Sequence, residues 1–193
     1  MLFTDQNDEQ IITEYLSSNK EEVFRFLLNK YDKHAYNFVR QMVVNNNDAE
    51  DITQEVFIKI WKNLKKYKNG QNFKTWFFTI AKNTTIDFLR KKKSIVFSDL
   101  ESKTNEIGEG DSFDFSETIE SNELLPDEII QKIQDREYLN KLLSQISTIY
   151  KTILLLHYQE EMTFEEIGKI LDKPLNTVKS YHRRAIIKLR EIA

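Results

Sequence analysis

Residues 163–191 read TFEEIGKILDKPLNTVKSYHRRAIIKLRE, and this stretch decides how the C-terminal part of the chain folds. Thr163 and Glu166 have the spacing of a capping box, which predicts the start of a short helix. Residues 172–174, Asp-Lys-Pro, predict a turn after that helix. Two helices joined by so short a turn approach each other closely, and Gly168 supplies the small residue that this approach needs. The stretch therefore predicts a helix–turn–helix.

The last helix, predicted from about Leu175 to Ile192, has two different faces. Its apolar residues recur at spacings of seven, four and three, which places them on one side: Val178, Ala185, Leu189 and Ile192. The opposite side carries polar and basic residues: Asn176, Lys179, Ser180, Arg183, Arg184 and Arg190. A helix with such a face can enter the major groove of DNA. The alternative is an ordinary helical hairpin on a protein surface, and we favour DNA binding.

The charges of the chain are segregated, although the net charge is only −3. Residues 59–93 hold eleven Lys and Arg against one acid, and residues 169–190 hold seven against one. Between them, residues 98–128 hold eleven Asp and Glu against one base. A single charged run is most often a solvated helix face, but two basic blocks separated by an acidic one predict contact with a polyanion at two places.

The N-terminal half shows helical periodicity in three segments, at about 20–44, 48–64 and 73–93. Asp48 is positioned to cap the second helix, whose expected buried face comprises Ile52, Val56, Phe57, Ile60, Trp61 and Leu64. In the third helix we expect burial of Phe77, Ile80, Ala81 and Leu89. With only four Gly and two Pro in 193 residues, the sequence predicts an all-α protein.

The periodicity fails between about Ser98 and Asn122, where acids, Ser and Gly are dispersed. Such a stretch inside one compact domain is uncommon, and it favours a flexible acidic linker. We therefore predict two helical-bundle domains, at 1–95 and 126–193, joined by a linker at 96–125, with the helix–turn–helix in the second domain.

The third predicted helix, FKTWFFTIAKNTTIDFLRKKK (73–93), mixes aromatic and basic residues. This combination suits single-stranded DNA, because bases stack on rings while cations follow the phosphates. Large aromatic residues are nevertheless more often core than base platforms, and we expect Trp76 to belong to the core. The basic residues, with Asn83 and Asp87, are the better candidates for contact.

Several classes of protein are excluded by composition. The chain has no Cys, which rules out disulfides and thiolate metal sites and fits a reducing compartment. It has no apolar run of membrane-spanning length, and its acidic N-terminus is unlike a signal peptide, so we expect a cytoplasmic protein without membrane insertion. No catalytic constellation, P-loop or metal-ligand spacing is present, and we expect neither an enzyme nor a metal or cofactor. Four acids within residues 48–55 suit a helix N-terminus and a basic partner better than a metal ion.

Three segments in this order resemble the sigma factors of bacterial RNA polymerase. DAEDITQEVFIKIW (48–61) is similar to their region 2.2, residues 73–93 to regions 2.3 and 2.4, and residues 163–191 to region 4.2. The two-domain layout without a region 3 resembles the extracytoplasmic-function (ECF) subfamily. The resemblance covers roughly residues 20–95 and 130–193.

The resemblance implies a transcription initiation factor with three contact surfaces. The residues implied to dock on the β′ clamp helices of core RNA polymerase are Asp51, Gln54 and Glu55. Those implied to face the −10 promoter element are Lys74, Lys82, Asn83, Asp87, Arg90 and Lys91. Those implied to read the −35 element are Asn176, Thr177, Lys179, Ser180, Arg183 and Arg184. The implied partners are core polymerase, through β′ and the β flap, and promoter DNA; an anti-sigma factor is a further partner that the family allows.

The second domain departs from the family pattern at several positions, and two of them bear on its structure. Asp172 stands where the turn usually has Gly, so a left-handed backbone there would be mildly strained. His182 stands at a usual core Leu position, and we expect it to be half-buried and not a base contact.

Two other functions compete with this interpretation. A stand-alone transcriptional regulator would share the helix–turn–helix but leaves the acidic helix and the basic helix of the first domain unexplained. A nucleic-acid-processing enzyme would need a metal-ligand or nucleophile cluster, which the sequence does not offer.

Overall fold

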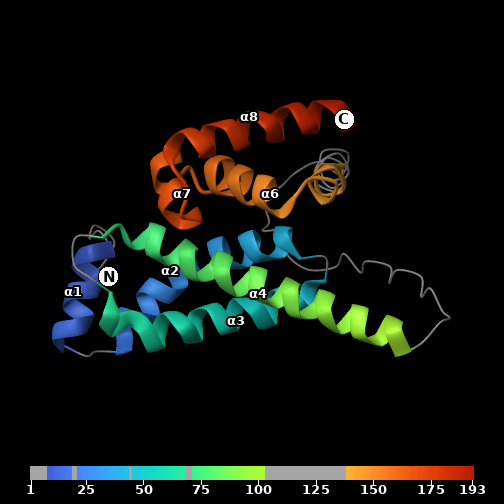
Figure 1. The fold of residues 1–193 in the computed structure, drawn as a ribbon. Helices are drawn as coiled ribbons and strands as arrows, with labels where there is room; N and C mark the ends of the chain where they lie inside the picture. The colour runs from blue at the N-terminus through green and yellow to red at the C-terminus, as the bar shows by residue number, and fades with distance from the viewer. Residues whose placement is uncertain (1–7, 19–20, 44, 68–70, 103–137) are drawn as a thin grey trace, which may run out of the picture.

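The computed structural model describes residues 8–18, 21–43, 45–67, 71–102 and 138–193. All regular elements in these ranges are helical, as the composition predicted (Figure 1). They are α1 (Asp8–Ser18), α2 (Glu21–Met42), α3 (Asn46–Asn63), the 3-10 turn η1 (Leu64–Lys66), α4 (Phe73–Ser102), a helical segment at 138–144, α6 (Thr148–Leu154), the π-helical turn η2 (Leu155–Gln159), α7 (Phe164–Leu171) and α8 (Leu175–Ile192).

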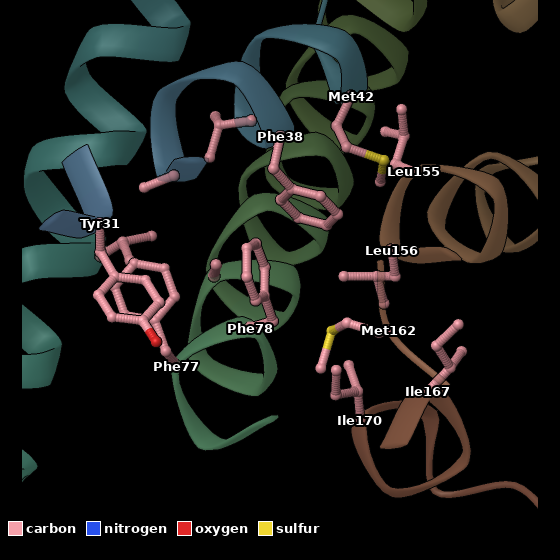
Figure 2. Packing of buried hydrophobic residues seen from close by; sticks show 14 of the residues in the cluster. Tyr31, Phe38, Met42, Phe77, Phe78, Leu155, Leu156, Met162, Ile167 and Ile170 are labelled. Carbon is pink, nitrogen blue, oxygen red and sulfur yellow. The ribbon is translucent and has the colours of Figure 1, made fainter. Parts of the chain in front are cut away.

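The first domain packs α2, α3 and α4 together, with α1 against α2. Rings from α2 and α4 meet in its centre: the Tyr31 and Phe77 centroids are 4.6 Å apart, and those of Phe38 and Phe78 are 5.5 Å apart in an edge-to-face arrangement (Figure 2). Phe38, Phe77 and Phe78 are at most 1% exposed. The expected burial of Phe77 and Ala81 is confirmed, whereas Phe78 is a core residue that the sequence analysis did not select.

Helix α1 is an element that the sequence analysis did not predict. Ile11 and Ile12 are fully buried, and the Asp8 carboxylate accepts hydrogen bonds from the Tyr31 hydroxyl and from Lys30 Nζ, the latter at 2.6 Å. Burial together with the neighbouring carboxylate raises the pKa of the Tyr31 hydroxyl. With only 11 residues, α1 depends on this tertiary packing more than on its own periodicity.

Two predicted boundaries in the first domain were wrong. Asn45, not Asp48, caps α3: the Asn45 side chain accepts a hydrogen bond of 2.7 Å from the Asn47 N–H, while Asp48 pairs with Lys92 at 2.6 Å. Helix α4 continues to Ser102, so residues 96–102 of the predicted linker are helical, because no Gly or Pro interrupts that stretch. The rest of the predicted linker, 103–125, lies outside the described residues.

The second domain is a compact set of short helices in which α8 packs against α6 and α7. Its core includes Ile153, Leu156, Ile167 and Val178, each fully buried. Helix α6 continues into η2, a wider turn in which the Glu160 N–H bonds to the Leu155 carbonyl at 3.2 Å.

The two domains lie against each other and share one hydrophobic core. Helix α7 contacts α4, and α6 contacts α2 (Figure 1). In Figure 2 Phe78 and Met42 of the first domain face Leu156, Met162 and Ile170 of the second. All five side chains are at most 6% exposed. Sequence periodicity gave no indication of this docking, because it reports which side of a helix is apolar and not which helix covers it.

Candidate nucleic-acid interface

Helix α8 presents its predicted contact residues to solvent. Val178 and Ala185 are fully buried on the side that packs on the domain. Five of the six predicted −35 residues are exposed and Thr177 is half-buried: Asn176, Thr177, Lys179, Ser180, Arg183 and Arg184. The structure therefore places this set on the solvent side of a single helix, with three cations among them, as an anionic groove would require.

Local hydrogen bonds define both ends of α7, and a short turn joins it to α8. Thr163 and Glu166 form the predicted capping box, with the Glu166 carboxylate accepting from the Thr163 N–H at 2.8 Å. At the other end of α7, the Lys173 N–H bonds to the Gly168 carbonyl at 2.9 Å. A Cβ on Gly168 would lie 2.8 Å from the Lys173 carbonyl oxygen, so the predicted need for a small residue is confirmed. Asp172, which stands where the family usually has Gly, has φ 51° and takes the left-handed conformation that is mildly strained for a residue with a side chain.

His182 is half-buried on α8, as predicted, and belongs to an aromatic cluster. Its Nε2 lies 3.1 Å from the Tyr158 hydroxyl, and its ring lies 5.0 Å from that of Phe164 and 5.3 Å from that of His157, centroid to centroid. Burial and the nearby His157 lower the pKa of His182. The His182 ring therefore packs against other rings of the second domain and is not part of the solvent face of α8.

The predicted −10 residues of α4 divide into two groups. Lys74 and Lys82 are half-buried beneath the second domain. Lys74 Nζ donates to the main-chain oxygen of Glu160, and Lys82 Nζ donates to the main-chain oxygen of Ile170 at 3.1 Å. Burial lowers the pKa of Lys82, and the carboxylates of Asp87 and Asp172 oppose that shift.

The second group lies further along α4. Asn83, Arg90 and Lys91 are exposed, and Asp87 is half-buried and pairs with Arg90 at 3.1 Å. Trp76 is half-buried against the core, with its ring 5.4 Å from that of Tyr67, so it packs as the sequence analysis expected.

Helix α3 carries a third exposed surface. Asp51, Gln54 and Glu55 are exposed, and Glu55 pairs with Lys59 at 2.8 Å. Ile58 and Trp61 extend the same face and are 49% and 58% exposed.

Trp61 was expected in the core, and that expectation was wrong. Its spacing of seven from Gln54 places the two residues on one helix face, a signal that was present in the sequence. We refer to Asp51, Gln54, Glu55, Ile58 and Trp61 as the α3 surface.

Among the described residues, no group of three or more His, Asp or Glu side chains is arranged to hold a metal ion. Within the same ranges, no helix is both long enough and apolar enough to span a membrane.

Comparison with known proteins identifies both domains. Residues 27–95 match the family model of sigma-70 region 2, and residues 136–189 match that of sigma-70 region 4. The chain is 29% identical over 171 residues to the ECF RNA polymerase sigma factor SigW of Bacillus subtilis, which covers 89% of each chain.

Two solved structures share the fold. CnrH in complex with the cytosolic domain of CnrY aligns with a TM-score of 0.68 over 96% of each chain, at 16% identity. RpoE of Bartonella quintana, in complex with the anti-sigma factor NepR, aligns with a TM-score of 0.66 over 87% of this chain and 94% of that one, at 21% identity.

A helical chain with these two matched regions is a member of the sigma-70 family of transcription initiation factors. Within that family, the chain belongs to the ECF sigma factors. Proteins of this family are transcription regulators rather than enzymes. We refer to the two domains as region 2 and region 4.

Proposed function

We propose that this protein binds core RNA polymerase and directs it to promoters by contacting duplex −35 DNA through α8 and the −10 element through α4. The observation that carries the proposal is the α3 surface. A stand-alone DNA-binding regulator needs only its basic helices to bind DNA. A factor that binds core polymerase needs a second contact surface, and the exposed acidic and apolar face of α3 fits that need.

The chemistry of the three surfaces supports this division. The solvent face of α8 combines Lys179, Arg183 and Arg184 with short polar side chains, which suits phosphates and base edges of a duplex. The exposed part of α4 combines Asn83 with Arg90 and Lys91, which suits an unpaired strand. Strand separation in this scheme comes from binding energy alone, with catalysis supplied by the polymerase.

On the α3 surface, carboxylates lie next to two large apolar side chains. Trp is one of the residue types most enriched in binding hot spots, and Trp61 is exposed. The neighbouring carboxylates favour a partner with basic side chains. We propose that this surface docks on the β′ clamp helices of the polymerase and that region 4 reaches the β flap. An anti-sigma factor is a further proposed partner, because the similar RpoE of Bartonella quintana was solved in complex with one.

A reconstitution tests the proposal directly. Purified protein is mixed with bacterial core RNA polymerase, the complex is isolated, and run-off transcription is measured on templates whose start sites were mapped after overexpression. We expect specific initiation with no other sigma factor present. A requirement for a second sigma factor would show a stand-alone regulator instead, and metal-dependent cleavage of the template would show a nucleic-acid-processing enzyme.

A further inference from the structure

A group of four rings lies beside the basic face of α8. Its members come from η2, α7 and α8, and they are His157, Tyr158, Phe164 and His182. The His157 ring stacks on that of Phe164 at 4.4 Å and lies edge-to-face with that of Tyr158 at 4.9 Å, centroid to centroid. The centroids of Tyr158 and His182 are 5.6 Å apart. We call these four residues the ring cluster, and it joins three elements of region 4.

Tyr158 is the exposed member of the ring cluster. It is 61% exposed, whereas the other three residues are half-buried. Tyr side chains are among the usual hydrogen-bond donors to DNA phosphates. A side chain that is already held in one place also loses little conformational entropy when it binds. An exposed phenol fixed by neighbouring rings is therefore suited to contact a ligand.

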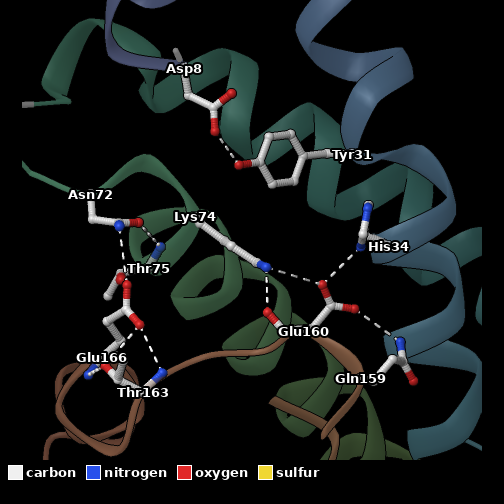
Figure 3. Close-up of polar contacts among 10 residues, drawn as sticks. All are labelled: Asp8, Tyr31, His34, Asn72, Lys74, Thr75, Gln159, Glu160, Thr163 and Glu166. Atoms are coloured by element: carbon white, nitrogen blue, oxygen red, sulfur yellow. Dashed lines mark hydrogen bonds and ion pairs between the residues drawn. The ribbon is translucent and has the colours of Figure 1, made fainter. Parts of the chain in front are cut away.

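The ring behind this phenol is fixed by a hydrogen bond and by stacking. His157 Nδ1 lies 2.9 Å from the main-chain oxygen of Met162. That oxygen can only accept, so Nδ1 carries the proton and donates. Phe164, on which His157 stacks, directly follows the N-cap residue Thr163, to which the Glu166 carboxylate bonds (Figure 3). The His157 ring is thus held from two sides.

His182 determines how the Tyr158 hydroxyl is oriented. Its Nε2 lies 3.1 Å from that hydroxyl. Burial and the nearby His157 lower the pKa of His182, so at neutral pH its ring is neutral and carries one proton. With that proton on Nε2, the imidazole donates to the phenolic oxygen. The phenolic proton is then available for an acceptor in solvent, such as a phosphate oxygen.

The Tyr158 hydroxyl lies at the edge of the cationic face of α8. Residues three apart on a helix are neighbours, with about 5–6 Å between their Cβ atoms, so Lys179 lies next to His182. Lys179 and Arg183 are both exposed. A DNA strand whose phosphates contact these two cations runs close to the hydroxyl, which is one hydrogen bond away from His182.

We propose that Tyr158 is a further DNA-binding residue of region 4: its hydroxyl donates to a backbone phosphate on the Lys179 side of α8, and His182 is the positioning residue that holds it. This inference rests on the proposed function and adds a contact from η2, outside the helix–turn–helix. A phosphate contact fixes where α8 lies on the duplex and carries no base preference. Local patterns do not reveal it, because Tyr158 and His182 are 24 positions apart.

Removal of a single oxygen atom tests the contact. Tyr158→Phe keeps the ring, and Tyr138→Phe makes the same change at another exposed Tyr, whose hydroxyl donates to the main-chain oxygen of Ala193. Fluorescence anisotropy measures affinity for a duplex with a mapped −35 element and for a shuffled duplex of equal length. We expect Tyr158→Phe to weaken binding to both about fivefold and Tyr138→Phe to match the wild type. Wild-type affinity of Tyr158→Phe for both duplexes would overturn the proposal.

Salt dependence distinguishes the phenol from a cation. A neutral donor releases no counterions, so Tyr158→Phe should keep the wild-type slope of log affinity against log salt concentration. Lys179→Ala should reduce the magnitude of that slope by about 0.9. A slope change in Tyr158→Phe as large as that in Lys179→Ala would mean that the substitution disturbs the cationic face, against the proposal.

Methylphosphonate substitution locates the phosphate. The analogue replaces one backbone phosphate of the −35 duplex at a time, in separate duplexes. At one position the wild type should lose about fivefold more affinity than Tyr158→Phe does, because the variant has no hydroxyl to lose a partner. Equal penalties in the two proteins at every position would contradict the contact.

Substitutions at His182 test its positioning role. The side-chain amide nitrogen of Gln can take the place of Nε2, whereas Leu cannot donate. We expect His182→Leu to weaken binding about as much as Tyr158→Phe does, and His182→Gln to keep most of the wild-type affinity. In the Tyr158→Phe background, His182→Leu should have no further effect. A full second loss in that double variant would show that His182 acts by packing alone.

Failure of this inference is distinguishable from failure of the proposed function. The ratio of the affinities for the two duplexes reports specific recognition of the −35 element and does not depend on a phosphate contact. A ratio of one in the wild type would contradict −35 recognition by α8. The effect of Tyr158→Phe on the shuffled duplex would still decide whether Tyr158 binds the backbone.

Discussion

Nζ of Lys82 donates a hydrogen bond to the main-chain oxygen of Ile170, 3.1 Å away and 88 residues later in the chain. Lys82 lies on the basic helix of region 2, and Ile170 lies on the first helix of the helix–turn–helix. This one bond shows that a residue proposed to face the −10 element also serves as a contact between the two regions. The arrangement of the regions therefore determines which of the proposed DNA contacts are available.

The α8 face should account for binding to duplex −35 DNA. Replacing Lys179, Arg183 and Arg184 together by Glu should abolish specific binding and reduce the salt dependence of log affinity by about 0.9 per lost phosphate contact. Fluorescence anisotropy against salt concentration measures both quantities. Lys141→Glu, an exposed reversal outside α8, should leave them near the wild-type values. Unchanged affinity in the triple variant would show that α8 is not the docking helix.

The carboxylates of the α3 surface should contribute to polymerase binding. Asp51→Lys with Glu55→Lys should weaken binding to core polymerase while the helicity stays intact, because both side chains are exposed. The control reverses two exposed acids on α2, Glu22→Lys with Asp32→Lys. Titration of core polymerase with labelled protein compares the two, and a normal holoenzyme in the first variant would refute the assignment.

Trp61 and Ile60 are neighbours on α3 with opposite roles. Trp61→Ala should weaken polymerase binding and change the free energy of unfolding by less than about 0.5 kcal/mol, because the ring is 58% exposed. Ile60→Ala should cost about 2–5 kcal/mol of stability, because Ile60 is 1% exposed. Urea unfolding and core titration separate the two effects. A large loss of stability in Trp61→Ala would show that this residue belongs to the core.

Gly168 should be required by packing. Gly168→Ala places a Cβ 2.8 Å from the Lys173 carbonyl oxygen, and the displacement of main chain that follows should cost about 1–3 kcal/mol in urea unfolding. Glu165→Ala, at an exposed position of the same helix, should be nearly neutral. An equal effect of the two substitutions would mean that α7 and α8 do not approach as closely as described.

The lowered pKa of His182 gives region 4 a pH dependence of defined sign. At acidic pH the folded protein binds fewer protons at His182 than the unfolded chain does. The contribution of His182 to the free energy of unfolding is therefore fully present above the ordinary His pKa of 6.5. It decreases as the pH falls from 6.5 toward the lower pKa of the folded state. Urea midpoints measured across that window should fall with pH in the wild type. In His182→Leu this contribution should be absent, and an unchanged slope would contradict the prediction.

Much of the local structure could be predicted from particular residues. The capping box of Thr163 and Glu166 and the bounds of α8 follow from short-range rules, and the structure reproduces them. Capping rules alone allow either Asn45 or Asp48 to cap α3. In the folded protein Asn45 is the cap, and Asp48 pairs with Lys92 on α4. Trp61 was included in the expected buried face of α3, although it lies on the exposed face.

The amino-acid order alone specified an all-helical chain of two regions, the polar face of α8 and the acidic residues of α3, because helix period, capping and charge are properties of neighbouring residues. Only the three-dimensional arrangement decided that the regions share a core, that Lys74 and Lys82 lie beneath region 4, and that Glu160 is buried between His34 and Lys74. Those contacts join residues roughly 90 to 130 positions apart, and no local pattern encodes which apolar face covers which.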